Sequence, residues 1–215
     1  MISIILPCYN EIENIDRLQK ALDSLEGERE ILFTDGGSTD GSFERIRYPK
    51  IQKAKGRGAQ MDVAVEQTKG DVLWFLHGDT FPEKTALRSI EESRAEWGCF
   101  KLRFRSKKAM MRIVAFNSDN RVRFRHIAYG DQGIFIRRAL YDDIGGFRHI
   151  PLMEDYDLSI RLKEKGYKPV LLKDTLFTDA RRFEDNGIWP TIFHMQRLQR
   201  AFRKGVDPAI LAKEY

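Results

Sequence analysis

The first half of the chain alternates short apolar runs with amphipathic segments. Apolar and β-branched runs predict strands at 2–6, 30–34 and 72–76, with a weaker strand at 50–54. Apolar residues at helical spacing predict a helix at 11–25, and shorter helices follow near 40–47 and 58–68. This alternation of strand and helix predicts an α/β fold with a mixed, mainly parallel sheet flanked by helices.

The second half of the chain is less regular. Its pattern predicts strands at 99–105, 133–137 and 169–172. Helices are predicted at 82–94, 107–125, 138–144, 154–165 and 188–204, with a last short helix beginning at Asp207-Pro208. The fold class is therefore α/β with a helical C-terminal extension, and 215 residues suit a single domain.

Composition and charge narrow the function classes. Apolar residues make up 42 % of the chain, enough for a core, and 37 basic against 32 acidic residues leave a net charge of +5. This excess suits an anionic ligand or a face attracted to phosphate or acidic lipid, and an ordinary solvated surface explains it equally well. The basic residues are spread among acidic ones without a nucleic-acid motif, so no nucleic-acid partner is expected.

Cysteine usage and the absence of long apolar runs indicate the compartment. Cys8 and Cys99 lie far apart in apolar segments, which favours buried free thiols over a disulfide. No run approaches the roughly 18–20 apolar residues that span a bilayer, and the start of the chain lacks the basic segment of a signal peptide. We therefore expect a cytoplasmic protein without a transmembrane segment.

Three polar stretches directly follow predicted strands: CYNE at 8–11, TDGGSTDGS at 34–42 and HGDT at 77–80. In parallel α/β sheets, ligands bind at the carboxyl ends of the strands, so these stretches are expected on one edge. In the second stretch, Asp35 at a strand end could accept a hydrogen bond from a base or ribose, and Gly36 allows close backbone approach. The alternative is an ordinary turn.

Two further stretches carry candidate chemistry. Gly56-Arg57-Gly58 precedes a predicted helix, where an anion such as a pyrophosphate could bind, although such loops are common. In His77-Gly78-Asp79, the imidazole and carboxylate would suit Mn²⁺ and the carboxylate Mg²⁺, but one histidine and one aspartate are also typical of a plain turn. Asp155, at a helix start in MEDYD, is either a general base or a favourable charge near the helix dipole.

The order of these pieces resembles the family 2 inverting glycosyltransferases, which have the GT-A fold, over roughly residues 2–210. The matching stretches are PCYNE, DGGSTDGS, GRGAQMD, FLHGDT, GDQGIFIRR with IGGF, and MEDYDLSIRL. FLHGDT stands where the family has its DxD motif and MEDYDLSIRL where it has its ED motif. Within the family the chain looks most like a small soluble bacterial subgroup with an H-x-D form of the DxD motif.

The resemblance implies a role for each matched residue. Pro7, Tyr9, Asn10 and Glu11 would line the nucleotide pocket with Asp35 and Gly36, and Arg57 would lie near the diphosphate or ribose. His77, Gly78 and Asp79 would border the nucleotide sugar, and Asp79 would bind Mn²⁺ or Mg²⁺. Asp155 would be the general base, and Gly130, Asp131, Gln132 and Glu154 would lie on the acceptor side. Residues 1–105 would form the donor-binding half of one domain, and 106–215 the acceptor-binding half with the C-terminal helices.

The chain also departs from the family pattern. His77 replaces the first aspartate of DxD, which weakens the negative charge of the site. The QxxRW segment of processive synthases is absent, so a non-processive single transfer to an acceptor hydroxyl is expected. Arg181 and Arg182 would either close over the diphosphate or form a solvated basic surface. The basic segment 107–125 could rest on the inner face of an anionic membrane, but a plain surface or a homodimer helix is favoured.

Three functions are compatible with these residues. The first is a metal-dependent inverting glycosyltransferase that uses a nucleotide-diphosphate sugar. The alternative is a nucleotide-sugar-binding protein of the same fold without transferase activity, which the replacement by His77 motivates. A nucleotidyltransferase is disfavoured because its Gly-rich, lysine-containing loop after the first strand is replaced here by PCYNE.

Overall fold

The computed structural model describes residues 1–52 and 56–215. Its described part contains one eight-stranded mixed sheet in the order β3-β2-β1-β4-β7-β6-β8-β5. The strands are β1 (Ile2–Cys8), β2 (Arg29–Asp35), β3 (Lys50–Gln52), β4 (Val72–Phe75), β5 (Thr80–Pro82), β6 (Trp97–Phe104), β7 (Phe135–Arg137) and β8 (Val170–Thr178).

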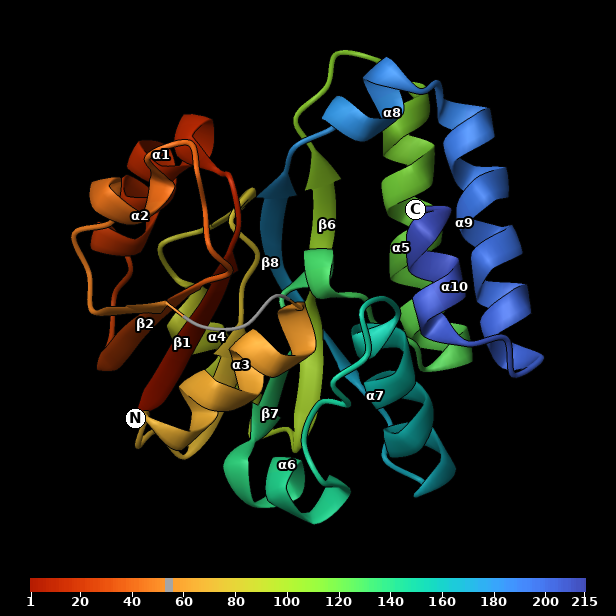
Figure 1. Cartoon of the computed structure of the whole chain (residues 1–215). Coiled ribbons are helices and arrows are strands. Elements are labelled where there is room, and N and C mark those ends of the chain that lie inside the picture. The colour runs from red at the N-terminus through yellow and green to blue at the C-terminus, as the bar shows by residue number, and fades with distance from the viewer. Residues whose placement is uncertain (53–55) are drawn as a thin grey trace.

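Helices cover both faces of this sheet (Figure 1). They are α1 (Ile12–Asp23), α2 (Ser42–Arg45), α3 (Arg57–Glu66), α4 (Ala86–Ser93), α5 (Met110–Arg125), the 3₁₀ turn η1 (Gly130–Gln132), α6 (Arg138–Ile144), α7 (Glu154–Glu164), α8 (Arg181–Asp185), α9 (Ile188–Arg203) and α10 (Pro208–Lys213). None of the described helices is long and apolar enough to cross a membrane.

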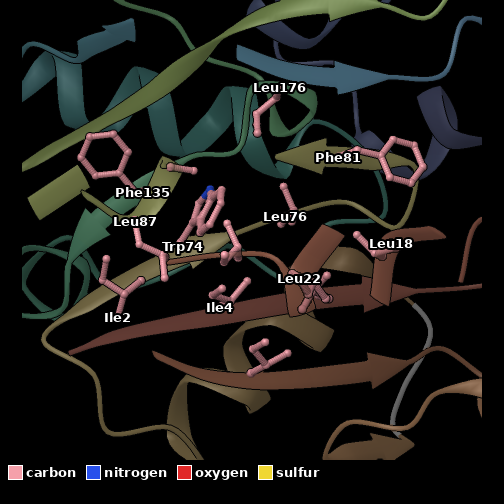
Figure 2. Packing of buried hydrophobic residues seen from close by; sticks show 14 of the residues in the cluster. Ile2, Ile4, Leu18, Leu22, Trp74, Leu76, Phe81, Leu87, Phe135 and Leu176 are labelled. Atoms are coloured by element: carbon pink, nitrogen blue, oxygen red, sulfur yellow. The ribbon is translucent and has the colours of Figure 1, made fainter. Parts of the chain in front are cut away.

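Alternation along the central strands divides the core into two layers. In β4, Trp74 faces the layer that contains Leu22 of α1 and Leu87 of α4 (Figure 2). Its neighbours Leu73 and Phe75 face the opposite layer, with side chains of α3, α6 and α7. Both faces of β4 are thus buried, as its continuous apolar run predicts.

The parallel part of the sheet aligns three strand ends. β1 pairs in parallel with β2 and with β4, so Cys8, Asp35 and Phe75 end their strands on the same edge. The other half is partly antiparallel: β7 runs against β4 and β6, and β5 runs against β8. The predicted mixed, mainly parallel sheet is confirmed.

The C-terminal helices form a separate layer beside α7. Leu198 of α9 and Leu211 of α10 pack with Tyr156 of α7 in a third apolar cluster. α8, α9 and α10 lie on the same side of the molecule as α5 (Figure 1). The predicted helical C-terminal extension is therefore present, and it covers the start of α7, where Asp155 lies.

Several predicted elements differ in their bounds. Residues 80–82 form a strand, and the helix predicted from Pro82 begins at Ala86. The strand predicted at 169–172 continues to Thr178, and the described part of the strand predicted at 50–54 covers 50–52, whereas residues 53 and 54 lie outside the described residues. Cys8 and Cys99 are buried free thiols, as predicted.

Candidate active site

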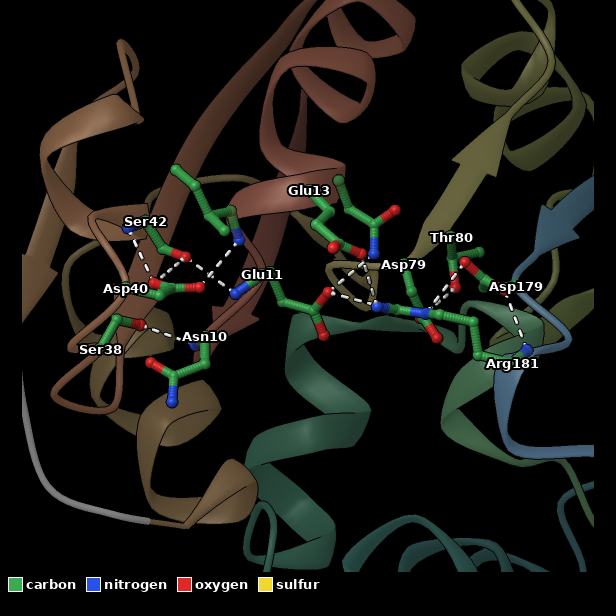
Figure 3. Close-up of polar contacts among 12 residues, drawn as sticks. Asn10, Glu11, Glu13, Ser38, Asp40, Ser42, Asp79, Thr80, Asp179 and Arg181 are labelled. Carbon is green, nitrogen blue, oxygen red and sulfur yellow. Dashed lines mark hydrogen bonds and ion pairs between the residues drawn. The ribbon is translucent and has the colours of Figure 1, made fainter. Parts of the chain in front are cut away.

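The loops after β1 and β2 are joined by reciprocal hydrogen bonds. The Asn10 amide N–H donates to Ser38 Oγ (2.9 Å), and the Thr39 N–H donates to Asn10 Oδ1 (2.9 Å). The Glu11 N–H donates to Ser42 Oγ (2.8 Å) and the Ile12 N–H to Asp40 Oδ2 (3.0 Å), so four side chain–backbone bonds connect the two segments. Figure 3 shows the bonds from Asn10 to Ser38 and from Glu11 to Ser42. Asn10 has a φ of 53°, a left-handed conformation that asparagine tolerates better than most residues.

Asp35 lies buried beneath this pair of loops. Its Oδ2 accepts hydrogen bonds from the N–H groups of Gly37 and Ser38, both 2.8 Å, and its Oδ1 accepts one from the Ser38 hydroxyl. The carboxylate therefore shapes the loop that follows β2. Pro7 and Gly36 are buried next to it, whereas the Tyr9 side chain is half exposed on the same sheet edge.

Gln60 of α3 ties the ends of β1 and β2 together. Its Nε2 donates to the Cys8 carbonyl (3.2 Å) and to the Thr34 carbonyl (2.8 Å), and the residue is buried. A Cβ on Gly36 would lie 3.1 Å from this Nε2, so a glycine keeps the contact uncrowded. Sequence reasoning missed Gln60, although it lies in the GRGAQMD stretch singled out for Arg57.

A cavity of about 220 Å³ lies between the sheet edge and the helices α7 to α9. It brings together six predicted site residues: Arg57, His77, Asp79, Asp131, Asp155 and Arg182. A larger hollow of about 610 Å³, near the start of β2, is lined by none of the predicted site residues. We take the smaller cavity as the candidate active site because the titratable groups converge there.

Asp155 lines this cavity, and backbone N–H groups hold its carboxylate in place. Its Oδ2 accepts a hydrogen bond from the Gly130 N–H (2.7 Å), and the Tyr156 N–H donates to its Oδ1 (2.6 Å). A Cβ on Gly130 would lie 2.2 Å from His77 Nε2 and 3.4 Å from Asp155 Oδ2. Gly130 therefore lets the imidazole and the carboxylate approach the same point.

His77 is a neutral group in this setting. Burial lowers the pKa of His77 to about 4, and the positive charge of Arg57 acts in the same direction. The imidazole is thus uncharged near neutral pH and can both donate and accept a hydrogen bond.

Arg57 and Glu154 form an ion pair beside Asp155. Arg57 Nε lies 2.7 Å from Glu154 Oε1, and the Glu154 side chain is only 1 % exposed. Burial opposes the charge on Arg57, but Glu154 and Asp155 outweigh it and raise the arginine pKa. Glu154 therefore lies behind Arg57, which itself stays charged and reaches the cavity.

Met153 holds an unfavourable backbone conformation directly before this pair. Its φ of 72° is left-handed, which is uncommon for a residue other than glycine, and it caps the start of α7. Such strain persists where the surrounding structure fixes it, and it clusters at functional sites. Here it begins the helix that carries Glu154 and Asp155.

Asp131 is the buried acid without a full set of partners. Its Oδ1 is enclosed and has no hydrogen-bond partner among the described residues. Burial raises the pKa of Asp131 to about 6, which the positive Arg121 only partly offsets. The adjacent Gln132 is committed to the fold, because its Oε1 accepts from Arg121 Nη2 (2.7 Å) and its Nε2 donates to the Phe100 carbonyl (3.4 Å).

Asp79 lies close to a group of acidic residues that Arg181 joins by ion pairs (Figure 3). Arg181 contacts Asp179 (3.1 Å), Glu13 (3.2 Å) and Glu11 (3.6 Å), as Figure 3 shows. Burial raises the pKa of Glu11, and the charge of Asp79 adds to the rise, whereas a hydrogen bond from Asn14 opposes it. A Cβ on Gly78 would lie only 3.0 Å from Glu11 Cγ, so Gly78 makes room for this acid.

Arg181 and Arg182, adjacent in sequence, have different surroundings in the structure. Arg182 lines the cavity, and its guanidinium stacks 3.8 Å from the centre of the Tyr215 ring. Arg181 does not line the cavity and is held by the acidic residues described above. In residues 1–52 and 56–215, no three His, Cys, Asp or Glu side chains are grouped to hold a metal ion by themselves.

Comparison with known proteins identifies the family of this chain. The family described as glycosyl transferase family 2 matches residues 3–145. The chain belongs to glycosyl transferase family 2. It is 24 % identical over 205 residues to glycosyltransferase AglE of Haloferax volcanii, covering 81 % of this chain and 65 % of AglE. It is 23 % identical over 201 residues to the probable glycosyltransferase YdaM of Bacillus subtilis, covering 77 % and 47 %.

Solved structures of this fold resemble the chain closely in shape. S. aureus TarS has a TM-score of 0.67 at 19 % identity, covering 83 % of this chain and 36 % of TarS. The mannosyltransferase PcManGT from Pyrobaculum calidifontis, in complex with GDP-Man and Mn²⁺, has a TM-score of 0.66 at 18 % identity, covering 93 % and 60 %. The GT-A fold expected from the sequence is confirmed. This family 2 chain spans about half to two thirds of the curated relatives AglE and YdaM.

The cavity also contains residues that the sequence did not reveal. Asp179 follows the unpredicted part of β8, and Phe104, Phe183 and Met195 contribute apolar walls. The alternation of Leu172, Leu176 and Thr178 as buried positions was the available signal for the longer strand. The apolar walls had no local signal, because their positions depend on how α8 and α9 return over the sheet edge.

Proposed function

We propose that this chain is a metal-dependent, inverting and non-processive glycosyltransferase. It moves a sugar from a nucleotide-diphosphate donor to an acceptor hydroxyl. The observation that carries the proposal is Asp155, whose carboxylate is fixed by the Gly130 N–H in the same cavity as Asp79 and Arg57. A fixed carboxylate next to a metal-binding acid and an anion-binding arginine suits general-base transfer to a phosphorylated donor.

Asp155 acts as the general base in this proposal. It takes the proton of the acceptor hydroxyl as that oxygen attacks the anomeric carbon, and the bond from that carbon to the diphosphate oxygen breaks on the opposite side. The electron pair leaves with the nucleoside diphosphate, so the anomeric configuration inverts. The Gly130 N–H holds the carboxylate, so Asp155 needs no large reorientation before it accepts the proton.

The donor set at Asp79 fits a hard divalent cation. Mg²⁺ and Mn²⁺ are commonly held by one or two carboxylates, with phosphate oxygens and water completing the shell. Asp79 supplies one such carboxylate, which explains why no all-protein cluster is needed. A bound cation would neutralise charge on the departing diphosphate. The Mn²⁺ in the PcManGT complex supports this choice.

Most of the remaining predicted residues, apart from His77 and Gly78, fall into three groups. Pro7, Tyr9, Asn10, Glu11, Asp35 and Gly36 form the loops proposed for the base and ribose. Arg57 and Arg182 supply positive charge for the diphosphate, and Arg181 would have to leave its acidic partners to join them. Gly130, Asp131, Gln132 and Glu154 remain assigned to the acceptor side. The division into a donor half at 1–105 and an acceptor half at 106–215 also stays a prediction.

Membrane contact and self-association through α5 also stay predictions. Ile113, Phe116 and Phe124 are exposed on this helix, and basic residues flank them. Such a surface suits either an anionic lipid headgroup layer or a second apolar helix.

The absence of a QxxRW segment supports single transfer rather than processive synthesis.

Replacing Asp155 by asparagine tests the proposal. The amide keeps the shape but cannot take a proton, so we expect transfer to fall by at least ~10²-fold. Donor binding with Mn²⁺, measured by calorimetry, should remain within about twofold of wild type. Asp142→Asn, on an exposed part of α6, is the matched control. Undiminished transfer by Asp155→Asn would remove the residue from this role, and donor binding without turnover in the wild type would favour a binding protein.

A further inference from the structure

The cavity has two chemically different sides. His77, Asp79 and Asp155 come from the loop after β4 and the start of α7. On the other side, Phe104 ends β6, and Phe183 and Met195 come from α8 and α9, which cover the sheet edge and also contribute Arg182, Thr191 and Gln199 to the lining. The polar side matches the donor and the reaction centre, so the apolar side needs another explanation.

The aromatic side chains on the apolar side of the cavity are held in place by contacts with other rings. Phe183 meets Phe104 edge to face, with ring centres 5.3 Å apart. Tyr156 contacts Tyr129, which also lines the cavity, and Phe202, each with ring centres 6.0 Å away. These contacts fix the rings without filling the cavity, so a ligand would meet a preformed surface.

The chemistry of this wall favours one kind of acceptor. Phe104, Phe183 and Met195 offer no hydrogen bonds through their side chains. Acceptor hydroxyl groups pressed directly against these three side chains would lose hydrogen bonds to water without replacement, which costs binding energy. An apolar group in the same place would instead remove both its own surface and that of the wall from water.

We propose that the acceptor is amphipathic: an aryl or alkyl portion adjoins its reactive hydroxyl and packs against Phe104, Tyr156, Phe183 and Met195. This inference rests on the proposed glycosyl transfer, because the hydroxyl must reach Asp155. The apolar portion comes either from a lipid or from a water-soluble aromatic compound, and the cavity chemistry is the same for both.

Binding of three glucosides tests this inference. Methyl, phenyl and octyl β-glucosides share one sugar and differ only in the apolar group, and octyl glucoside is kept below its micelle concentration. Dissociation constants are measured by ligand-observed NMR on the whole chain with Mn²⁺ and a nucleoside diphosphate. We expect phenyl or octyl glucoside to bind roughly tenfold or more tightly than methyl glucoside. A preference for octyl indicates a lipid source, and one for phenyl a soluble aromatic source.

Variants then locate the binding. Phe183→Ala and Met195→Gln should each reduce the advantage of the apolar glucoside several-fold. Phe193→Ala is the matched control, because Phe193 lies on α9 but is 64 % exposed and does not line the cavity. If Phe183→Ala fails to fold, as judged by circular dichroism, Met195→Gln still decides the question.

Two results would overturn the inference of an amphipathic acceptor. Equal or absent binding of all three glucosides overturns the inference, as does an advantage that survives both cavity variants. Calorimetry of nucleotide sugar with Mn²⁺ on the same samples separates this failure from failure of the proposed function. Normal donor binding with no apolar preference rejects only the amphipathic acceptor.

Discussion

His77 is the residue that we expect to stand where the family motif has its first aspartate. In this chain its ring lies against Gly130 and next to Asp155, and burial lowers the pKa of His77 to about 4. An aspartate there would add a fifth carboxylate to the four that already line this small cavity, those of Asp79, Asp131, Asp155 and Asp179. A neutral imidazole avoids that repulsion and still offers a hydrogen bond to a substrate hydroxyl. The change is therefore compatible with an intact site.

At the same scale, Asp131 is expected to make the protein less stable as pH rises. Its pKa of about 6 in the folded chain exceeds the value of 3.8 expected when unfolded. The folded state thus binds more protons between these values, so stability falls from about pH 4 to about pH 6 and the full penalty remains above. Asp131→Asn removes the penalty and should gain on the order of 1–3 kcal/mol at pH 7.5, with a smaller gain at pH 4.5.

Urea unfolding of the wild type and of Asp131→Asn at both pH values measures this difference. Asp142→Asn, at an exposed position on α6, serves as the control and should change stability little. A gain that is the same at pH 4.5 and pH 7.5 would show that Asp131 ionises as an ordinary surface acid does.

At the scale of elements, the local sequence pattern predicts some strands, whereas others form only through tertiary pairing. Continuous apolar runs correctly placed β1, β2 and β4, because strands buried on both faces need apolar residues throughout. β5 escaped prediction because its three residues TFP are too short for a pattern and exist through pairing with β8. β8 in turn carries Lys173 and Asp174 within its length, since it is only half buried.

The link between β1, β2 and α3 gives an element-scale prediction. Gln60→Leu keeps the approximate volume but removes the Nε2 hydrogen bonds to the Cys8 and Thr34 carbonyls, and the Cys8 carbonyl keeps only its bond from the Gly36 N–H. The loss of these two buried hydrogen bonds should lower the free energy of unfolding by about 1–3 kcal/mol. Gln67→Leu, exposed at the end of the same helix, is the control. Urea denaturation compares them, and equal stability of the two variants would contradict the bridging role of Gln60.

At the scale of the whole molecule, the cavity connects segments that are far apart in sequence. Arg57, Asp79, Asp131, Asp155 and Arg182 meet there, although the first and last are separated by more than half of the chain. A ligand that contacts them all binds only the folded state, so its binding energy adds to global stability.

Donor and metal should therefore raise the melting temperature together. At 100-fold excess over its dissociation constant, a ligand contributes about 2.7 kcal/mol, or roughly 5–10 °C for a chain of this size. The measurement is a thermal-shift screen of nucleotide sugars with Mn²⁺, with Mg²⁺, and with a chelator. Asp79→Ala should lose the metal-dependent part of the shift, whereas Asp142→Ala should keep it. A metal-dependent shift that persists in Asp79→Ala would move the metal site elsewhere.

The sequence by itself determined the α/β class, the central strands and the three polar loops at the strand ends. These follow from local periodicity and from the rule that parallel strands end on one edge. The ordered motifs also indicated the family and named Asp79, Arg57 and Asp155, which the structure brings to one cavity.

Only the tertiary structure decided which candidates share the cavity and what surrounds them. It placed Arg182 in the wall and Arg181 among acids, set Glu154 behind Arg57, and turned Phe183 and Met195 toward the site. These outcomes depend on how α8 and α9 fold back over α7 and the sheet edge. Packing between distant segments leaves no periodic signal within either segment. These positions therefore could not be predicted from the sequence pattern.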